Sequence, residues 1–345
     1  MKGLVCTEIG KVQLQDVPKP EIKNDDEALI KVTKCTICGS DIHLMHGGIP
    51  STPPYVLGHE YVGVVEEVGK GVKKFKPGDR VAGPPAIFCG RCDNCQAGAI
   101  AQCEHGGIYG SGPTAGGLSG AQSEYMVLPY ADSNQLHVPD NMSDEVALLI
   151  CDNVGTGYFS VANGDPSPGD DIVIWGAGPV GLCAVQCAKN LFGPSKVIVV
   201  DYIDSRLGKA KEMGADYVIN ASDDVVAKVM DLTDGRGANV CSECAGDQKS
   251  FAEAVLCAAV KGTVSVVGIG ERMDIPLPDA FVKNVNVKMG LGLIPNLKRL
   301  MDLVGKGVID PSPVITHRIS LDEIEAYYPK FEAREDGIIK IAVTP

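Results

Sequence analysis

The sequence predicts an α/β protein with two domains, a mostly antiparallel β domain and a doubly wound parallel sheet. Two domains are the default expectation for 345 residues, because a single hydrophobic core rarely grows that large. Short β-branched segments separated by Gly, Pro and Asn turns dominate residues 1–150. From about residue 170 to 290, strands alternate with amphipathic helices, which is typical of parallel βαβ units.

The first domain is expected to comprise residues 1–150 together with residues 296–345. Its segments ALIKVTK, YVGVVEEV and SEYMVL have the length and the β-branched content of strands. Ser143 can cap a short helix over SDEVALLI, which has Asp144 and Glu145 in its first turn. The closing segment GIIKIAVTP is predicted to be a strand that returns to this domain.

The second domain is expected to comprise residues 151–295, with regular alternation of strands and helices. The predicted strands are DIVIW, KVIVVD, DYVIN, ANVCSE, TVSVVG and VNVKMG. The predicted helices between them are GPVGLCAVQCAKNLF, DSRLGKAKEMGA, SDDVVAKVMDLT and DQKSFAEAVLCAAV. Trp175 ends the first of these strands and is expected to lie in the core of the sheet.

Composition and charge exclude several classes of function. The net charge of −13 opposes binding to nucleic acid or to an anionic membrane. The first residues contain no apolar run typical of a signal peptide, and the longest uncharged run, 172–188, is too short and glycine-rich for a membrane helix. We therefore expect a cytoplasmic protein, in which thirteen cysteines indicate metal binding, redox chemistry or burial rather than a disulfide framework.

A glycine motif follows the first predicted strand of the second domain. Gly176, Gly178 and Gly181 form G-x-G-x-x-G between that strand and a predicted helix, where free N–H groups can bind a pyrophosphate. Asp201 ends the next strand, twenty residues after the last glycine, where it can bind a ribose diol and repel a 2′-phosphate. The motif predicts NAD rather than NADP, and the alternative is a glycine-rich turn beside a surface aspartate.

Four closely spaced cysteines, Cys89, Cys92, Cys95 and Cys103, have the pattern C-x2-C-x2-C-x7-C. Four thiolates can close a tetrahedron around zinc and leave no position open for chemistry, so we interpret them as a structural zinc site. An iron–sulfur cluster or a redox disulfide is the alternative interpretation.

A third group of possible ligands lies within CTICGSDIHLMHGG and YVLGHEYVG. It offers zinc ligands, a hydroxyl, an imidazole and two carboxylates, from Cys38, Ser40, Asp41, His43, His59 and Glu60. A single cysteine and a single histidine twenty-one residues apart are more often buried core residues. The presence of several kinds of possible ligand within two short segments suggests a site here.

These motifs together resemble the zinc-dependent medium-chain alcohol dehydrogenase family over nearly the whole chain. The family's CGSDxH, GHE, four-cysteine lobe, GxGxxG with its downstream aspartate, and closing THR…DG.IK occur in order, the last as THRISLDEI and DGIIKIAV. The resemblance implies a GroES-like catalytic domain that binds zinc and a Rossmann domain that binds the dinucleotide.

The resemblance also implies roles for individual residues. Cys38 and His59 resemble ligands of a catalytic zinc, and Glu60 resembles a neighbouring carboxylate that can be an outer or transient ligand. Ser40 and His43 resemble a proton relay. The remaining positions resemble contacts of the nicotinamide, the ribose or the pyrophosphate, namely Thr156, Arg206, Pro179, Val180, Gly268 and Leu291.

The third ligand of the catalytic zinc is implied to be Asp152. In the family this ligand lies four residues before the threonine of a TGY signature, and counting back from Thr156 reaches Asp152, whereas most members have cysteine there. Cys151 is expected to point elsewhere as buried packing. Secondary-alcohol members with this aspartate generally prefer NADP and lack the four-cysteine lobe, so this chain combines features of different subgroups.

The resemblance implies a zinc- and NAD-dependent dehydrogenase, a homodimer or homotetramer, that interconverts a primary alcohol, secondary alcohol or polyol with an aldehyde or ketone. A zinc-free quinone or enone reductase of the same fold, or a non-enzymatic zinc- or NAD-binding protein, is the alternative. The substrate pocket is expected to depend on the loops MHGGIPSTPP and GLGLIPN.

Overall fold

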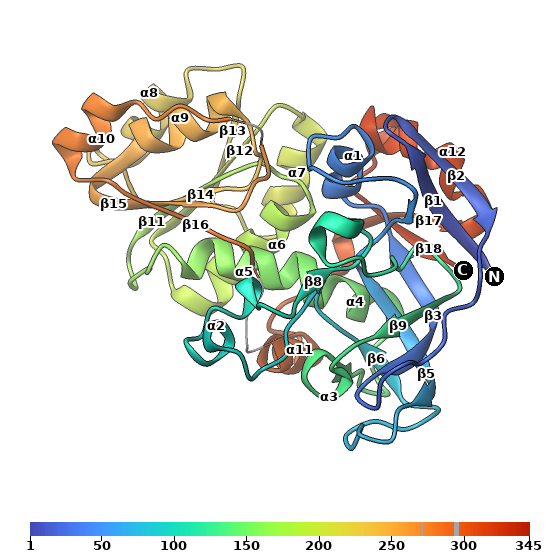
Figure 1. The fold of residues 1–345 in the computed structure, drawn as a ribbon. Coiled ribbons are helices and arrows are strands. Elements are labelled where there is room, and N and C mark those ends of the chain that lie inside the picture. The colour runs from blue at the N-terminus through green and yellow to red at the C-terminus, as the bar shows by residue number, and fades with distance from the viewer. Residues whose placement is uncertain (271, 293–296) are drawn as a thin grey trace. The chain divides into compact units, whose positions relative to one another are not determined.

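The computed structural model describes residues 1–270, 272–292 and 297–345 of the chain (Figure 1). The chain divides into two compact units. Unit 1 comprises Met1–Asp152, Leu293–Gly305 and Ile315–Pro345, and unit 2 comprises Asn153–Gly292 and Lys306–Val314. The units differ from the predicted domain limits in three places: Cys151 and Asp152 belong to unit 1, unit 1 resumes at Leu293 rather than at residue 296, and Lys306–Val314 belongs to unit 2.

Unit 1 is built mainly of antiparallel sheets, as predicted. The larger sheet has the order β10-β6-β5-β3-β18-β17, with β9 also paired to β3, and the smaller sheet has the order β2-β1-β4. Its strands are β1 (Lys2–Glu8), β2 (Lys11–Asp16), β3 (Ala28–Thr36), β4 (Tyr55–Val56), β5 (Tyr61–Val68), β6 (Arg80–Ala82), β9 (Tyr125–Leu128), β10 (Leu136–His137), β17 (Ile315–Ser320) and β18 (Lys340–Thr344). A separate pair joins β7 (Ala86–Ile87) to β8 (Gly107–Ile108).

The predicted return of the C-terminal strand is confirmed, because β18 pairs antiparallel with β3, matching Ala342 to Thr36. The predicted cap of Ser143 is also confirmed, since its side chain accepts a hydrogen bond from Val146 N. The helices of unit 1 are α1 (Gly39–Met45), α2 (Asp93–Gln96), α3 (Ala131–Asn134), α4 (Asp144–Leu149), α11 (Leu297–Gly305) and α12 (Ile324–Glu332). Short 3₁₀ turns are η1 (Ile100–Gln102), η2 (Pro113–Ala115), η6 (Leu321–Glu323) and η7 (Glu335–Gly337).

A π-helical segment, η3 (Ile150–Val154), follows α4 and contains both Cys151 and Asp152. Such wide turns are rare, and they frequently occur at functional sites because they change the direction in which one side chain points.

Unit 2 contains a six-stranded sheet with the order β13-β12-β11-β14-β15-β16, in which all neighbouring strands are parallel. Its strands are β11 (Asp171–Trp175), β12 (Lys196–Asp201), β13 (Tyr217–Asn220), β14 (Ala238–Glu243), β15 (Ala258–Val266) and β16 (Asn286–Met289). The chain order reverses between β11 and β14, so the predicted doubly wound sheet is confirmed. In such sheets, ligands bind beyond the carboxyl ends of the strands at this reversal.

Helices cover both faces of this sheet (Figure 1). They are α5 (Gly155–Ala162), α6 (Pro179–Cys187) with its π-helical extension η4 (Ala188–Phe192), α7 (Asp204–Glu212), α8 (Val225–Leu232), α9 (Gln248–Cys257) and α10 (Leu277–Lys283), and a 3₁₀ turn, η5 (Ser312–Val314), also belongs to this unit. Residues from α8, α9 and α10 form one core with the strands, and the fully buried Trp175 belongs to it as predicted.

In unit 2, one expected helix ends early and one observed helix was not predicted. The helix predicted over 247–260 ends at Cys257, because the backbone of Ala258 pairs with Ala238 and starts β15. Helix α10 was not predicted, since its Phe281 and Val282 are exposed and give no amphipathic pattern. In the described residues, no helix is both long and apolar enough to cross a membrane.

Candidate active site and metal centres

Four side chains that offer metal ligands meet in unit 1. One ligand atom from each of Cys38, His59, Glu60 and Asp152 lies within 4.8 Å of the other three. Cys38 precedes α1, the pair His59 and Glu60 precedes β5, and Asp152 lies in η3. The fold therefore brings together three segments that are far apart in the sequence.

The turn before His59 depends on glycine. Gly58 has a φ of +94°, and a Cβ there would lie 2.6 Å from the side chain of Gln122. Only glycine adopts this conformation without strain. The G of the GHE motif therefore allows His59 to enter the cluster directly before a buried strand.

The two ring nitrogens of His59 face different groups. His59 Nδ1 lies 3.4 Å from Asp41 Oδ1, whereas His59 Nε2 lies 3.4 Å from Ser40 Oγ and 3.8 Å from Glu60 Oε1. Burial lowers the pKa of His59, but the charge of Asp41 and its hydrogen bond more than offset that effect, so the pKa lies well above its ordinary value. This orientation directs Nε2 toward the other ligand groups, as a metal-binding imidazole requires.

Glu60 is paired with a lysine to which the sequence analysis gave no role. Lys340 Nζ donates to Glu60 Oε1 at 2.5 Å, and both side chains are 1% exposed. Burial raises the pKa of Glu60 to about 7, although the charge of Lys340 opposes the shift. The only sequence signal was a lysine inside the apolar segment IIKIAV, whose neighbours indicate a buried position.

Cys151 does not belong to the cluster formed by the described residues. It is buried, and burial raises the pKa of its thiol to about 12, so it remains protonated. The cluster itself combines a thiol, an imidazole and carboxylates, which is a donor set that zinc prefers. These residues fit a zinc ion.

The relay residues lie on and beside α1. Ser40 is half-buried and its hydroxyl reaches His59, whereas His43 is exposed. Asp41 is fully buried between them and accepts a hydrogen bond from Cys38 N at 2.9 Å. The substrate loop GLGLIPN was predicted to line the pocket, but its residues 293–296 lie outside the described residues.

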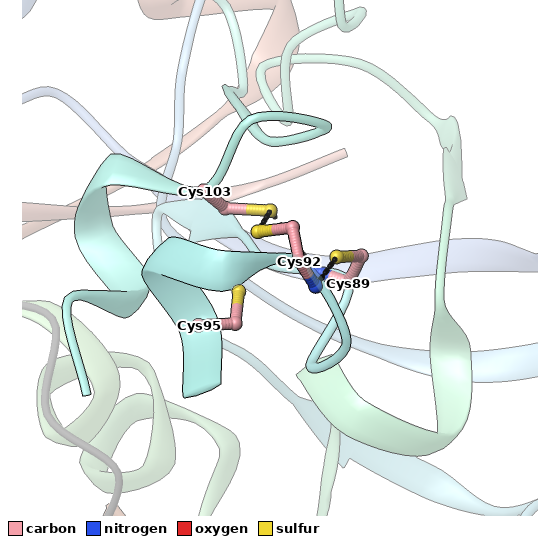
Figure 2. A group of neighbouring side chains, drawn as sticks. All are labelled: Cys89, Cys92, Cys95 and Cys103. Atoms are coloured by element: carbon pink, nitrogen blue, oxygen red, sulfur yellow. Dashed lines mark hydrogen bonds between the residues drawn. The ribbon is translucent and has the colours of Figure 1, made fainter. Parts of the chain in front are cut away.

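The four cysteines of the lobe also converge. The sulfurs of Cys89, Cys92, Cys95 and Cys103 all lie within 4.8 Å of one another, and Figure 2 shows them pointing toward a common centre. Cys92 Sγ and Cys103 Sγ are 3.9 Å apart, and all four thiols are free. The arrangement fits a tetrahedral ion with four thiolate ligands.

Backbone N–H groups point at these sulfurs. Cys89 Sγ accepts from Cys92 N at 3.3 Å and from Arg91 N at 3.4 Å, and Cys103 Sγ accepts from Cys89 N at 3.2 Å. Burial raises the pKa of Cys89, but these hydrogen bonds outweigh it and lower the pKa to about 7. The loop therefore stabilises the thiolate form of Cys89, whereas burial raises the pKa of Cys95 to about 12.

The glycine turn of unit 2 has the geometry that its sequence predicted. Gly176 has a φ of +93°, and a Cβ at Gly181 would lie 1.8 Å from Gly176 O, so neither position accepts another residue. Gly178 has open space around it and caps α6, which starts at Pro179 and Val180. The first turn of the helix is thus free to receive an anion.

Asp201 is held by two backbone N–H groups. Its Oδ2 accepts from Ala177 N at 2.7 Å, and its Oδ1 accepts from Ile203 N at 2.8 Å. Each carboxylate oxygen has a second lone pair, so Asp201 can still accept hydrogen bonds from a diol. The aspartate therefore connects the glycine turn to the end of β12.

The other cofactor candidates are also in unit 2. Thr156 lies in the first turn of α5, where a Cβ at Gly292 would come 2.8 Å from its Cα. Arg206 lies in α7 and Leu291 is exposed. A Cβ at Gly268 would lie 2.5 Å from Glu243 Oε2, and this buried carboxylate was missed because ANVCSE indicated only a strand.

Comparisons with known proteins agree with this geometry. The family model for the alcohol dehydrogenase GroES-like domain matches residues 24–140, and the model for zinc-binding dehydrogenase matches residues 179–305. The zinc-type alcohol dehydrogenase-like protein AdhB of Bacillus subtilis is 35% identical over 380 residues, covering 100% of both chains. The chain belongs to the zinc-dependent medium-chain alcohol dehydrogenase family.

Solved structures of this family share the fold. The alcohol dehydrogenase TADH from Thermus sp. ATN1 has a TM-score of 0.93 and 34% identity, and the match covers 100% of this chain and 99% of that chain. A zinc-binding dehydrogenase from Sinorhizobium meliloti 1021, solved with NADP, has a TM-score of 0.87 and 30% identity, with coverage of 100% and 99%. A protein described as a short chain alcohol dehydrogenase from Escherichia coli CFT073, solved with NADH, has a TM-score of 0.88 and 29% identity, with the same coverage.

Membership in the alcohol dehydrogenase family makes this protein an oxidoreductase. It supports the predicted dehydrogenase and does not support the quinone reductase or the non-enzymatic protein as alternatives.

Proposed function

We propose that this alcohol dehydrogenase uses NAD and a catalytic zinc held by Cys38, His59 and Asp152 to interconvert an alcohol with an aldehyde or ketone. The observation that carries the proposal is the convergence of these three residues and Glu60 within 4.8 Å. Zinc at this position would supply a Lewis acid that polarises the substrate oxygen and lowers the pKa of an alcohol.

The charges of the site support this ligand set. A thiolate from Cys38 and a carboxylate from Asp152 balance the charge of a divalent ion, and His59 adds a neutral ligand. Glu60 already has a cationic partner in Lys340, at 2.5 Å. We infer that Glu60 is an outer carboxylate in the resting site. The positive charge of Lys340 balances the negative charge of Glu60, so the site carries no uncompensated third negative charge.

Ser40 and His43 are proposed to move the substrate proton outward. The Ser40 hydroxyl lies beside His59, so it can contact a substrate hydroxyl bound at the cluster. His43 is exposed on the same helix, where its imidazole can exchange a proton with water. In this proposal, Ser40 contacts the reacting oxygen and His43 contacts the solvent.

The choice of NAD rests on Asp201. One family relative was solved with NADP and another with NADH, so family membership leaves both cofactors open. The carboxylate of Asp201 is fixed by Ala177 and Ile203, and a fixed negative charge favours a ribose diol over a 2′-phosphate. The proposed cofactor contacts are Gly176, Gly178, Pro179, Val180, Gly181, Asp201, Arg206, Thr156, Gly268 and Leu291.

The four-cysteine lobe is proposed to hold a second, structural zinc. All four sulfurs are close enough to bind one ion, and backbone N–H groups of the loop donate hydrogen bonds to two of them, Cys89 Sγ and Cys103 Sγ. Four protein ligands leave no open position, so this zinc would stabilise the loop and take no part in catalysis.

A homodimer or homotetramer is proposed from the apolar surface of unit 2. β16 is the edge strand of the sheet, and its Met289 is 70% exposed. The preceding helix α10 exposes Phe281 and Val282 at 79% and 78%. Exposed apolar side chains beside an open strand edge are typical of surfaces that pair with a second chain. Separately, we propose that the protein is cytoplasmic.

Metal analysis combined with a substrate screen tests this function. We expect two zinc ions per chain, and NADH formation with members of a panel of primary alcohols, secondary alcohols and polyols. A protein that holds two zinc ions but oxidises no alcohol in the panel, and reduces no matching aldehyde or ketone, would contradict the proposed reaction. A protein with only one zinc ion would contradict the proposed sites.

A further inference from the structure

A chain of buried hydrogen bonds connects helix α12 to the proposed catalytic zinc ligands. The hydroxyl of Tyr328 donates to Gln122 Oε1 at 2.7 Å, and Gln122 Nε2 donates to Asp41 Oδ2 at 3.0 Å. All three side chains are fully or almost fully buried. This hydrogen-bond chain connects distant parts of the sequence, because Tyr328 and Gln122 are 206 residues apart.

The orientation of the Gln122 amide is fixed by its partners. Gln122 Nε2 also donates to Thr36 O at 2.9 Å, so both of its hydrogens face acceptors, and Oε1 accepts from the Tyr328 hydroxyl. The side chain packs against Gly58, where a Cβ would lie 2.6 Å from Gln122 Cγ. Gln122 therefore cannot shift without moving the backbone directly before His59.

Asp41 connects this chain to two of the metal ligands. Its Oδ2 accepts from Cys38 N at 2.9 Å, and its Oδ1 lies 3.4 Å from His59 Nδ1. A carboxylate in this position holds Nδ1 in its protonated form and leaves the Nε2 lone pair for a metal. If the carboxylate rotates, both Cys38 and His59 lose their support.

We propose that Gln122 and Tyr328 are positioning residues of the catalytic zinc site. They hold the Asp41 carboxylate in the one orientation that serves both Cys38 and His59, and they do so without contacting the metal. The inference rests on the proposed function, in which Cys38 and His59 bind zinc.

The surroundings of the network favour this role over simple packing. Tyr328 belongs to the apolar core of unit 1, and Gln122 is fully buried. A buried hydrogen bond contributes little net stability, because replacing both of its partners by apolar groups of the same shape can be nearly neutral. We therefore interpret the hydrogen bonds from Tyr328 through Gln122 to Asp41 as a device that fixes the orientation of the Asp41 carboxylate.

The rate of zinc release from the holoenzyme into excess chelator, followed with a coloured zinc indicator, tests the inference. The variants are Gln122→Met, which keeps the length of the side chain, and Tyr328→Phe, which removes one oxygen. Tyr109→Phe is the matched control, because Tyr109 is equally buried in the same core and its hydroxyl has no hydrogen-bond partner among the described residues. A Cys38→Ala protein identifies the release phase that belongs to the four-cysteine lobe.

We expect Gln122→Met to release the catalytic zinc faster by on the order of 10- to 100-fold, the usual effect of removing a group that orients a metal ligand. Tyr328→Phe should accelerate release severalfold, and Tyr109→Phe should match the wild type. If Gln122→Met does not fold, Tyr328→Phe decides the question.

Two other outcomes separate the inference from the function on which it rests. If Gln122→Met and Tyr328→Phe melt at lower temperature but release zinc at the wild-type rate, the network is only structural and the inference is overturned. If Cys38→Ala holds as much zinc as the wild type, the proposed catalytic site itself is wrong.

Discussion

The ammonium group of Lys340 lies 2.5 Å from Glu60 Oε1 inside unit 1, where both side chains are 1% exposed. Lys340 is the first residue of β18, the C-terminal strand that pairs with β3. Glu60 directly follows His59, a proposed zinc ligand. Strand β18 thus places a positive charge beside the cluster of proposed zinc ligands.

Replacing Lys340 by Met should destabilise the protein strongly. The change leaves the Glu60 carboxylate buried without its cation, and breaking a buried pair in this way costs about 3–5 kcal/mol. Denaturant unfolding measures the loss. The double variant Glu60→Gln with Lys340→Met should recover much of it, because no unpaired charge remains. A single Lys340→Met variant as stable as the wild type would show that the pair is unimportant.

Replacing Asp201 by Ser should reduce the preference for NAD over NADP. Hydrogen bonds to charged groups contribute about 1.5–3 kcal/mol, so the ratio of kcat/KM values for the two cofactors should fall by on the order of 10- to 100-fold. Asp201→Asn keeps the shape of the side chain, but it removes the charge and replaces one accepting oxygen by an NH2 donor, so it should also lower the preference for NAD. A wild-type enzyme that uses NADP as efficiently as NAD would refute the assignment.

Cys92→Ser should lose one zinc ion per chain and retain the other. The lobe would then lack one of its four thiolates, and we expect the free energy of unfolding to fall by more than about 2 kcal/mol. Metal analysis and denaturant unfolding measure the two effects. Cys6→Ala is a suitable control, because Cys6 is buried in unit 1 and lies outside both ligand clusters. Retention of both ions by Cys92→Ser would contradict a structural zinc in the lobe.

The sequence predicts those parts of the fold that depend on local patterns. Alternating strands and helices predicted the doubly wound sheet, and the capping residue Ser143 predicted the start of α4. Helix α10 has no such pattern, because Phe281 and Val282 are exposed on its surface. The end of α9 at Cys257 is set by the pairing of Ala258 with Ala238, which is a tertiary contact.

The same distinction applies to the site. Short spacings within CGSDxH, GHE and the four cysteines indicate ligands, since those residues are neighbours in the chain. Lys340, Gln122 and Tyr328 carry no comparable signal. Gln122 lies in GAQSEY, which resembles an ordinary loop entering a strand, and only the fold brings its amide between Asp41 and Tyr328. Partners that meet through tertiary structure alone were therefore missed.

The central claim is that Asp152, and not its neighbour Cys151, binds the catalytic zinc. Asp152 lies in the ligand cluster, whereas Cys151 is a buried thiol whose pKa is raised to about 12 by burial. The most direct test measures zinc content and turnover of Asp152→Ala and Cys151→Ala side by side. Asp152→Ala should lose the catalytic zinc and nearly all turnover while still binding NAD, and Cys151→Ala should keep both zinc ions and near-normal activity, with a stability loss of about 1 kcal/mol or less. Loss of the catalytic zinc from Cys151→Ala, together with its retention by Asp152→Ala, would contradict the claim.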